Sequence, residues 1–197
     1  MTLSMPLARR LRRGLLLGAV AALAGASACE DPFKLTAQSP NLDNTFELWA
    51  LTGGPAAFPT ALLVPQATAV RLDAAGSFDL AFDIDTDGRV RVYPVGAVVS
   101  PIAGTRTVEF LRGSGPFNAI VEAPRTGWLS DSVLVVNEGS SFLVKVTTQF
   151  CQYELQQVVY AKFFVDSVIP AQRRMKISSR INPNCGFRSL LSGIPEF

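Results

Sequence analysis

SFDLAFDIDTDGRVRVYPV, which spans residues 77–95, has the pattern of two β-strands joined by a tight turn. In both halves apolar residues occupy every second position, so that they share one face of a strand, while Asp79, Asp83 and Asp85 fall on the opposite face. The apolar positions are Phe78, Leu80, Phe82 and Ile84 before the turn and Val90 and Val92 after it. An Asp-Gly pair between two alternating runs is a strong hairpin signal. The stretch therefore predicts an antiparallel β-hairpin.

The same alternation recurs along most of the chain. Further strands are expected at 45–51, 68–72, 105–112, 131–136, 141–148, 156–168 and 173–181. Turn sequences rich in glycine and proline separate them, and no β-α-β rhythm is present. Only residues 116–124 look helical, and Pro124 would end that helix after about two turns. We therefore expect an all-β fold, a single antiparallel β-sandwich or β-barrel-like domain with at most one short helix.

The first 28 residues have the composition of a secretory signal peptide. Four arginines between residues 9 and 13 precede an apolar run over 15–24, and small residues occupy 26–28. This order of basic head, short apolar stretch and small-residue cleavage zone is that of a leader removed on export. The apolar run is shorter than the roughly 20 residues that a membrane-spanning helix needs.

The triplet Ala26-Ser27-Ala28 followed by Cys29 resembles the lipobox of bacterial lipoproteins, with Ala26 where that family most often has Leu. In the family, the cysteine thiol receives a diacylglycerol and cleavage exposes the cysteine amine. The resemblance covers only the leader and Cys29, and implies a signal peptide over 1–28 and a lipid anchor at Cys29. The polar composition of 29–44 indicates a tether, and the alternation places a β domain over 45–197. The resemblance also implies an exported protein that is anchored to a membrane of the bacterial cell envelope, on its periplasmic or cell-surface side.

Two more cysteines, Cys151 and Cys185, remain when Cys29 carries lipid, and an even number can pair. The strands expected at 156–168 and 173–181 form a hairpin that brings both cysteines to the same end, with an offset that requires a bend or bulge. Export favours oxidation of the pair. We expect a Cys151–Cys185 disulfide, and the alternative is two buried free thiols.

The charge of the mature chain argues against nucleic acid as a partner. Four of the 18 basic residues and none of the 16 acidic residues lie in the leader, which leaves 14 basic and 16 acidic residues and a net charge of −2. The densest basic group, over 173–180, is the pattern of one solvated strand face. The expected partners are the membrane, through the lipid, and a protein or ligand of the envelope that the sequence does not identify.

Asp83, Asp85 and Asp87 raise the question of a metal site. With Gly88 they match the first six positions of a D-x-D-x-D-G calcium loop, but Pro94 stands where the bidentate glutamate should be. A hairpin explains the same residues, because Asp–Arg pairs across the turn would fix the register. We favour the hairpin and expect no metal, and keep a calcium-dependent binding module using loop 83–88 as an alternative.

No catalytic residues can be assigned from the sequence. It contains no histidine, which removes Ser-His-Asp and Cys-His systems, and no nucleotide-binding glycine motif, so no cofactor is expected. A carboxylate-based hydrolase and a small outer-membrane β-barrel ending at Phe197 are further alternatives, although Pro195 and Gly193 would break a lipid-facing final strand. We expect a non-catalytic binding or structural domain, not an enzyme.

Overall fold

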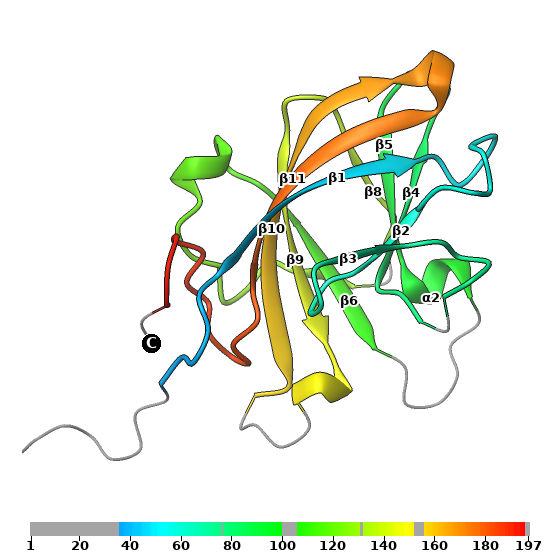
Figure 1. The fold of residues 1–197 in the computed structure, drawn as a ribbon. Coiled ribbons are helices and arrows are strands. Elements are labelled where there is room, and N and C mark those ends of the chain that lie inside the picture. Colours follow the sequence, from blue (N-terminus) through cyan, green and yellow to red (C-terminus); the bar gives the residue numbers. More distant parts are fainter. Residues whose placement is uncertain (1–35, 76, 100–105, 131, 152–155, 196–197) are drawn as a thin grey trace, which may run out of the picture. The chain divides into compact units, whose positions relative to one another are not determined.

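The hairpin expected over 77–95 is present in the computed structural model of the chain (Figure 1). Its strands are β4 (Leu80–Ile84) and β5 (Val90–Pro94), paired in the register that sets Asp83 opposite Arg91. The structure describes residues 36–75, 77–99, 106–130, 132–151 and 156–195. Cys29, the expected leader and the first part of the expected tether lie outside these residues.

The described strands form two sheets in which every pairing is antiparallel. The six-stranded sheet has the order β1 (Leu42–Trp49), β11 (Arg174–Asn182), β10 (Val158–Ile169), β9 (Ser141–Thr147), β6 (Thr107–Arg112), β7 (Leu129–Ser130). The five-stranded sheet has the order β3 (Thr68–Val70), β2 (Ala61–Leu63), β4, β5, β8 (Leu134–Val136). Two open sheets in face-to-face layers make a sandwich rather than a closed barrel, which confirms the expected all-β class and resolves its two forms.

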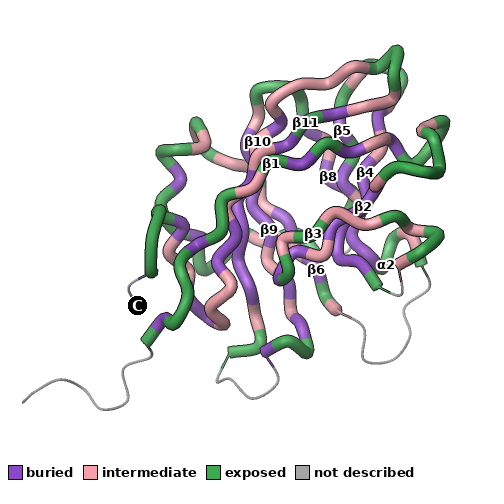
Figure 2. The backbone as a smooth tube through the Cα atoms, in the orientation of Figure 1, coloured by how far each residue is buried: buried purple, intermediate pink, exposed green. Residues whose placement is uncertain are grey.

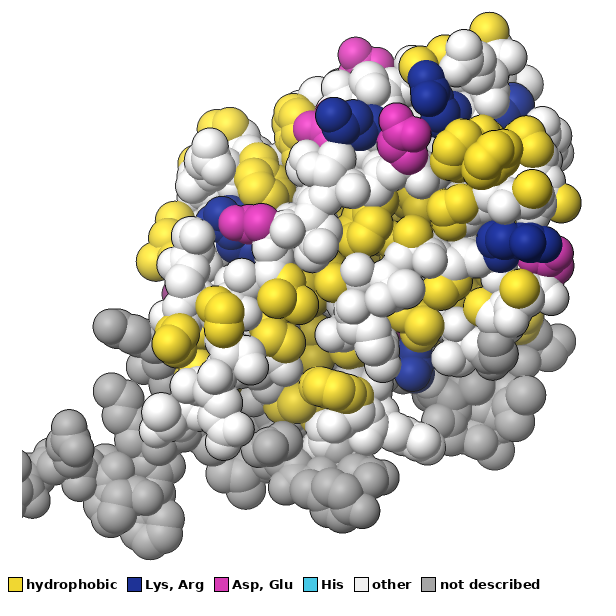
Figure 3. Space-filling model, in the orientation of Figure 1, with side chains coloured by type: hydrophobic (Ala, Val, Ile, Leu, Met, Phe, Trp, Pro, Cys, Tyr) yellow, Lys and Arg dark blue, Asp and Glu magenta, His cyan; other side chains and the backbone are white. Residues whose placement is uncertain are grey.

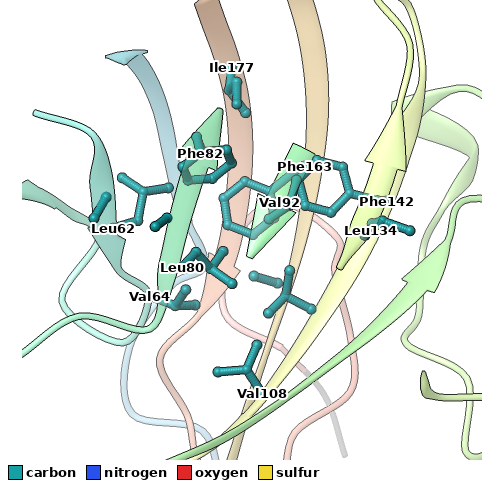
Figure 4. Packing of buried hydrophobic residues seen from close by; sticks show 14 of the residues in the cluster. Leu62, Val64, Leu80, Phe82, Val92, Val108, Leu134, Phe142, Phe163 and Ile177 are labelled. Atoms are coloured by element: carbon teal, nitrogen blue, oxygen red, sulfur yellow. The ribbon is translucent and has the colours of Figure 1, made fainter. Parts of the chain in front are cut away.

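The core lies between the sheets, and both contribute aromatic side chains to it (Figure 4). Phe82 comes from the five-stranded sheet, while Phe142 and Phe163 come from neighbouring strands of the other and stack with ring centroids 5.2 Å apart. All three are fully buried, and burial of each side chain contributes about 1.5–3 kcal/mol. In Figure 2 the buried residues concentrate on the strands of both sheets.

The expected Cys151–Cys185 disulfide is confirmed, with the two Cα atoms 5.8 Å apart. Cys151 ends a 3₁₀ turn, η2 (Gln149–Cys151), and is buried against the core, whereas Cys185 follows the end of β11. A bulge at Asp166 interrupts the β10–β11 register, as the offset required. The bulge shifts the register by one residue only, which is less than the offset between Cys185 and the position directly opposite Cys151 in the hairpin. The rest of this offset is accommodated outside the strands, where both cysteines lie.

A second apolar cluster covers the outer face of the six-stranded sheet. Leu143 of β9 and Tyr160 of β10 point away from the sandwich and pack with Ile120, Ala123 and Leu190. The covering residues belong to two segments, 117–128 and 183–195, that cross this face. The sheet is therefore covered on both sides over part of its length.

Two buried asparagines hold the C-terminal segment in this position. Asn41 donates from Nδ2 to the carbonyls of Ser189 and Leu191, at 3.0 and 2.7 Å. Asn182 donates to Phe187 and again to Ser189, at 3.0 and 2.9 Å. The segment has almost no regular structure, so these side chains satisfy carbonyls that a strand ladder would otherwise pair.

The helix expected over 116–124 is wrong. A short 3₁₀ turn, η1 (Phe117–Ala119), occupies its start, and the described residues contain a single α-helical turn, α2 (Val95–Val98), directly after β5. Burial of Ile120 and Ala123 against the outer face of the sheet draws the chain into an extended path after η1, so tertiary packing overrides the local pattern. No helix of the described residues is long and apolar enough to span a membrane.

Several strands also differ from expectation in their boundaries or were not expected. β1 begins at Leu42, three residues before the expected start. β2 and β7 were not expected: β2 is a short continuous apolar run, and β7 has only two residues, so neither shows an alternating pattern.

Candidate functional site

A cleft of about 630 Å³ opens on the outer face of the six-stranded sheet. Its volume falls in the range of sites that hold small organic ligands. Residues of three segments line it: 121–125, the start of β10 with the preceding Gln156, and 186–191. These segments are far apart in the sequence and meet only because two of them cross the same sheet face.

The two walls of the cleft are joined to each other by backbone hydrogen bonds. Leu190 donates to the carbonyl of Val121 at 2.7 Å, and Ala123 donates to that of Arg188 at 2.8 Å. Glu122 and Ser189 form the β-bridge between these bonds. The walls therefore form a short two-stranded ribbon whose position is fixed before any ligand binds.

An ion pair fixes the charged side chains of this ribbon. Arg188 lies 2.9 Å from Glu122, Nη2 to Oε1, and its Nε donates to the carbonyl of Ala123 at 2.6 Å. Arg125, which also lines the cleft, is exposed and has no ion-pair partner among the described residues. The lining thus carries two arginines and one glutamate, and Arg125 is the cation without a counter-charge.

Tyr160 of β10 lies at the base of the cleft. Only 7% of the residue is exposed, and its ring lies 5.8 Å from that of Trp128. No described residue hydrogen-bonds its hydroxyl group. Although the residue as a whole is buried, its hydroxyl oxygen keeps accessible surface, so this group is available to a ligand or to water in the cleft.

Gly186 is needed where the C-terminal segment passes the sheet. Its φ of +83° lies in the left-handed region, and a Cβ atom there would lie 2.9 Å from Cβ of Gln156. Its N–H donates to the carbonyl of Val158 at 2.9 Å. A side chain at this position would push the segment away from β10 and change the shape of the cleft.

Lys162, two residues beyond Tyr160 on the same face of β10, is buried beneath η1. Its Nζ donates to the carbonyls of Phe117 and Ile120, at 2.9 and 2.7 Å, and lies 4.4 Å from the centre of the Phe117 ring. Burial, together with the positive charge of Arg180 on the neighbouring strand, lowers the pKa of Lys162 to about 8. The ammonium therefore satisfies the end of the 3₁₀ turn without a carboxylate as direct partner.

The acidic residues of the hairpin do not converge on a metal position. Asp85 accepts hydrogen bonds from the backbone N–H groups of Asp87 and Arg89, at 3.0 and 2.8 Å, and from Arg89 Nε at 2.8 Å. Arg89 also pairs with Asp87 at 2.8 Å, and Arg91 lies 4.0 Å from Asp85. Within the described residues no group of three or more histidine, cysteine, aspartate or glutamate side chains could hold a metal ion.

The hydrogen bonds of the turn also act on the titration of Asp85. Partial burial raises the pKa of this carboxyl, but the bonds from Arg89 and from the Asp87 backbone outweigh it and lower the pKa below its usual value. The turn therefore stabilises the carboxylate form of Asp85.

On the face shown in Figure 3, acidic and basic side chains lie next to each other at several places, as expected where aspartates and arginines form ion pairs.

Two aspartates have roles that the hairpin pattern did not indicate. Asp83 pairs with Arg173, from the turn between β10 and β11, at 2.7 Å. Asp79, expected on the outer face, is fully buried, accepts a hydrogen bond from Val64 N–H at 2.7 Å and pairs with Arg106 at 3.0 Å. Burial raises the pKa of Asp79, and Arg106 opposes that rise. These partners are distant in sequence, so no local pattern could reveal them.

Comparison with known proteins identifies no family: no family model matches the sequence, and searches of curated proteins and of solved structures find no match.

Cys29, the expected lipid site, lies outside the described residues. Cys151 and Cys185 stabilise the end of the β10–β11 hairpin. The cleft residues were not expected from the sequence, because hydrogen bonding and packing between separate segments create the site.

Proposed function

We propose that this protein is a lipoprotein of the bacterial cell envelope whose β-sandwich is a non-catalytic binding domain. The leader is removed, Cys29 carries the lipid, and the cleft on the outer face of the six-stranded sheet receives a ligand. The observation that carries the binding role is the cleft itself, with a preformed ribbon as walls and an unpartnered tyrosine hydroxyl at its base.

The disulfide supports the lipid anchor. It uses two of the three cysteines, so Cys29 has no cysteine of its own chain left to pair with. A free thiol at the start of an exported chain would be open to oxidation, whereas a thioether to diacylglycerol is inert. The basic, apolar and small-residue segments before Cys29 are those that export and lipid attachment require.

The chemistry of the cleft supports binding rather than catalysis. The chain has no histidine, so the Ser189 hydroxyl in the described lining has no imidazole base to activate it as a nucleophile. Glu122, the carboxylate of the lining, is held by Arg188 at 2.9 Å. A calcium-dependent role is less well supported, because arginines and backbone N–H groups already occupy the oxygens of Asp85.

The anchor is tested by intact mass. Protein purified from a lipoprotein-competent bacterial host should begin at Cys29 and carry the added mass of two or three acyl chains. Cys29→Ser should abolish that mass and release the protein from membranes, while Thr36→Ala should change neither. An unmodified Cys29, or a leader still attached to the purified protein, overturns the proposal.

The binding role is tested by filling the cleft. Ligand-observed NMR with a library of metabolites and short peptides should identify compounds that bind the wild type and fail to bind Ser189→Phe. Ser77→Phe, at an exposed position outside the cleft, should leave their binding intact. Binding that survives Ser189→Phe, in a variant with an unchanged circular dichroism spectrum, would remove the cleft from the proposal.

A further inference from the structure

We propose that the ligand of the cleft is an organic carboxylate that carries a small apolar group, the chemistry of a peptide C-terminus or of a branched-chain carboxylic acid. The inference rests on the binding role proposed above and names the class of ligand. It follows from the charge of the lining, from its free hydrogen-bond donor and from the apolar residues at its rim.

The net positive charge of the lining favours an anionic ligand. Arg188 is matched by Glu122, which leaves Arg125 without a partner among the described residues. Lys162 adds a second positive charge on the same face of β10, roughly 7 Å along the strand from Tyr160. Its direct partners are two carbonyls and an aromatic ring, none of which removes a full charge. An anion in the cleft would be attracted by both cations.

Tyr160 supplies the donor that would orient the anion. The residue is more than nine-tenths buried and lines the cleft, and no described residue accepts a hydrogen bond from its hydroxyl. A carboxylate is an acceptor without protons of its own, so it satisfies such a donor directly. Charge-assisted hydrogen bonds of this kind are stronger than neutral ones.

The rim supplies the apolar contact. Val121 and Leu191, one on each wall, line the cleft with 48% and 54% of their surface exposed. Exposed aliphatic side chains on both sides of a site that contains an arginine favour a ligand with one charged end and one apolar end. A branched aliphatic group such as the side chain of leucine would find apolar contacts at this rim.

A carboxylate suits the site better than a phosphate monoester. The lining has a net charge of one, from two arginines and one glutamate, which a single negative charge neutralises. A phosphate monoester carries about −1.5 to −2 at neutral pH, more than the lining itself neutralises, because Lys162 lies outside the lining and its ammonium already donates to two carbonyls. The planar guanidinium of Arg125 can bind a carboxylate through two parallel hydrogen bonds.

Matched acids and amides test the inference. The probes are 4-methylpentanoate, N-acetyl-alanyl-leucine and the amide of each, titrated by NMR into the full mature protein in a non-ionic detergent. Each acid should bind at least about 10-fold more tightly than its amide, because only the acid can pair with Arg125. Arg125→Gln should weaken acid binding by a similar factor, and Tyr160→Phe should weaken it a few-fold.

Arg112→Gln is the control, since Arg112 is also exposed but lies on β6 outside the cleft. A peptide that binds more tightly than 4-methylpentanoate identifies a peptide C-terminus as the source, and equal affinities identify the free acid; both results support the carboxylate. Equal binding of acids and amides, equal effects of Arg112→Gln and Arg125→Gln, or no binding of either acid at about 10 mM, overturns it. Such a failure would overturn only the carboxylate ligand. The intact-mass test of Cys29 and the Ser189→Phe test of the cleft would still decide the proposed function.

Discussion

Arg173 and Asp83 connect the two sheets of the sandwich through an ion pair of 2.7 Å, although 90 residues separate them in the sequence. Arg173 precedes β11 in the six-stranded sheet, and Asp83 belongs to β4 in the five-stranded one. The same guanidinium donates to the carbonyls of Thr52 and Ile84, each at 2.8 Å. One side chain thus satisfies two acceptors on the five-stranded sheet and a third, Thr52, in the loop between β1 and β2.

Arg173→Lys should lower the free energy of unfolding by about 1–3 kcal/mol, because an ammonium cannot reach all three acceptors in this geometry. Urea denaturation of the purified protein measures the loss. Arg174→Lys is the control: its partner Glu47 lies 3.7 Å away and is largely exposed, so the change should cost less than about 0.5 kcal/mol. Equal losses in the two variants would show that the contact with Asp83 adds nothing.

Removal of the disulfide should have a large effect. The bond joins residues 34 positions apart, and a loop of this size corresponds to about 3–4 kcal/mol in the chain-entropy model. The double variant Cys151→Ala/Cys185→Ala should unfold at a correspondingly lower urea concentration, and reduction of the wild type should reproduce the shift. An unchanged midpoint, or two reactive thiols from these residues in the unreduced protein, would contradict the assignment.

Lys162 should make the stability of the protein depend on alkaline pH. Its pKa of about 8 in the folded protein is below the value of 10.5 for a free lysine, so between these values the unfolded chain binds more protons. The free energy of unfolding therefore rises with pH in this window, by about 2 kcal/mol from pH 7 to 9.5. Urea denaturation at both pH values should show the rise in the wild type and its loss in Lys162→Met. An identical pH dependence in the two proteins would refute it.

Asp85 should stabilise the hairpin without binding calcium. Asp85→Asn removes the ion pair with Arg89, so the melting temperature should fall at neutral pH. The pKa of Asp85 is lower in the folded protein than its usual value, so its contribution is present at neutral pH and is lost as the pH falls through the folded pKa. Wild type and variant should therefore converge in acid. Millimolar calcium should leave both melting temperatures unchanged, and a shift in the wild type alone would restore the calcium site.

Much of the fold could be predicted from alternation alone. Nine of the strands fall where the sequence shows alternation, because each sheet buries one side in the core, while its other side is covered over only part of its length. The pattern failed at residues 116–124, where contact with the outer face of the sheet decides the conformation. It also misplaced Asp79, because both faces of the chain are covered there and burial no longer follows a period of two.

The candidate site could not be predicted in the same way. The sequence pattern places Tyr160 in the expected strand over 156–168, and nothing in the sequence shows that its hydroxyl lacks a hydrogen-bond partner. Arg125 and Leu191 lie in segments without regular alternation, which meet through the ribbon around Glu122 and Ser189. The Cys151–Cys185 pair was predictable because counting cysteines needs no knowledge of packing.

The hydrogen bonds of Asn41 determine where a lipid tether would join the domain. Its side chain binds the carbonyls of Ser189 and Leu191, two residues that line the cleft. Asn41 follows Cys29 by twelve residues, which span at most about 40 Å when fully extended. In a lipidated protein this tether would hold the mouth of the cleft near the bilayer surface. The cleft would then meet mainly molecules that accumulate at that surface.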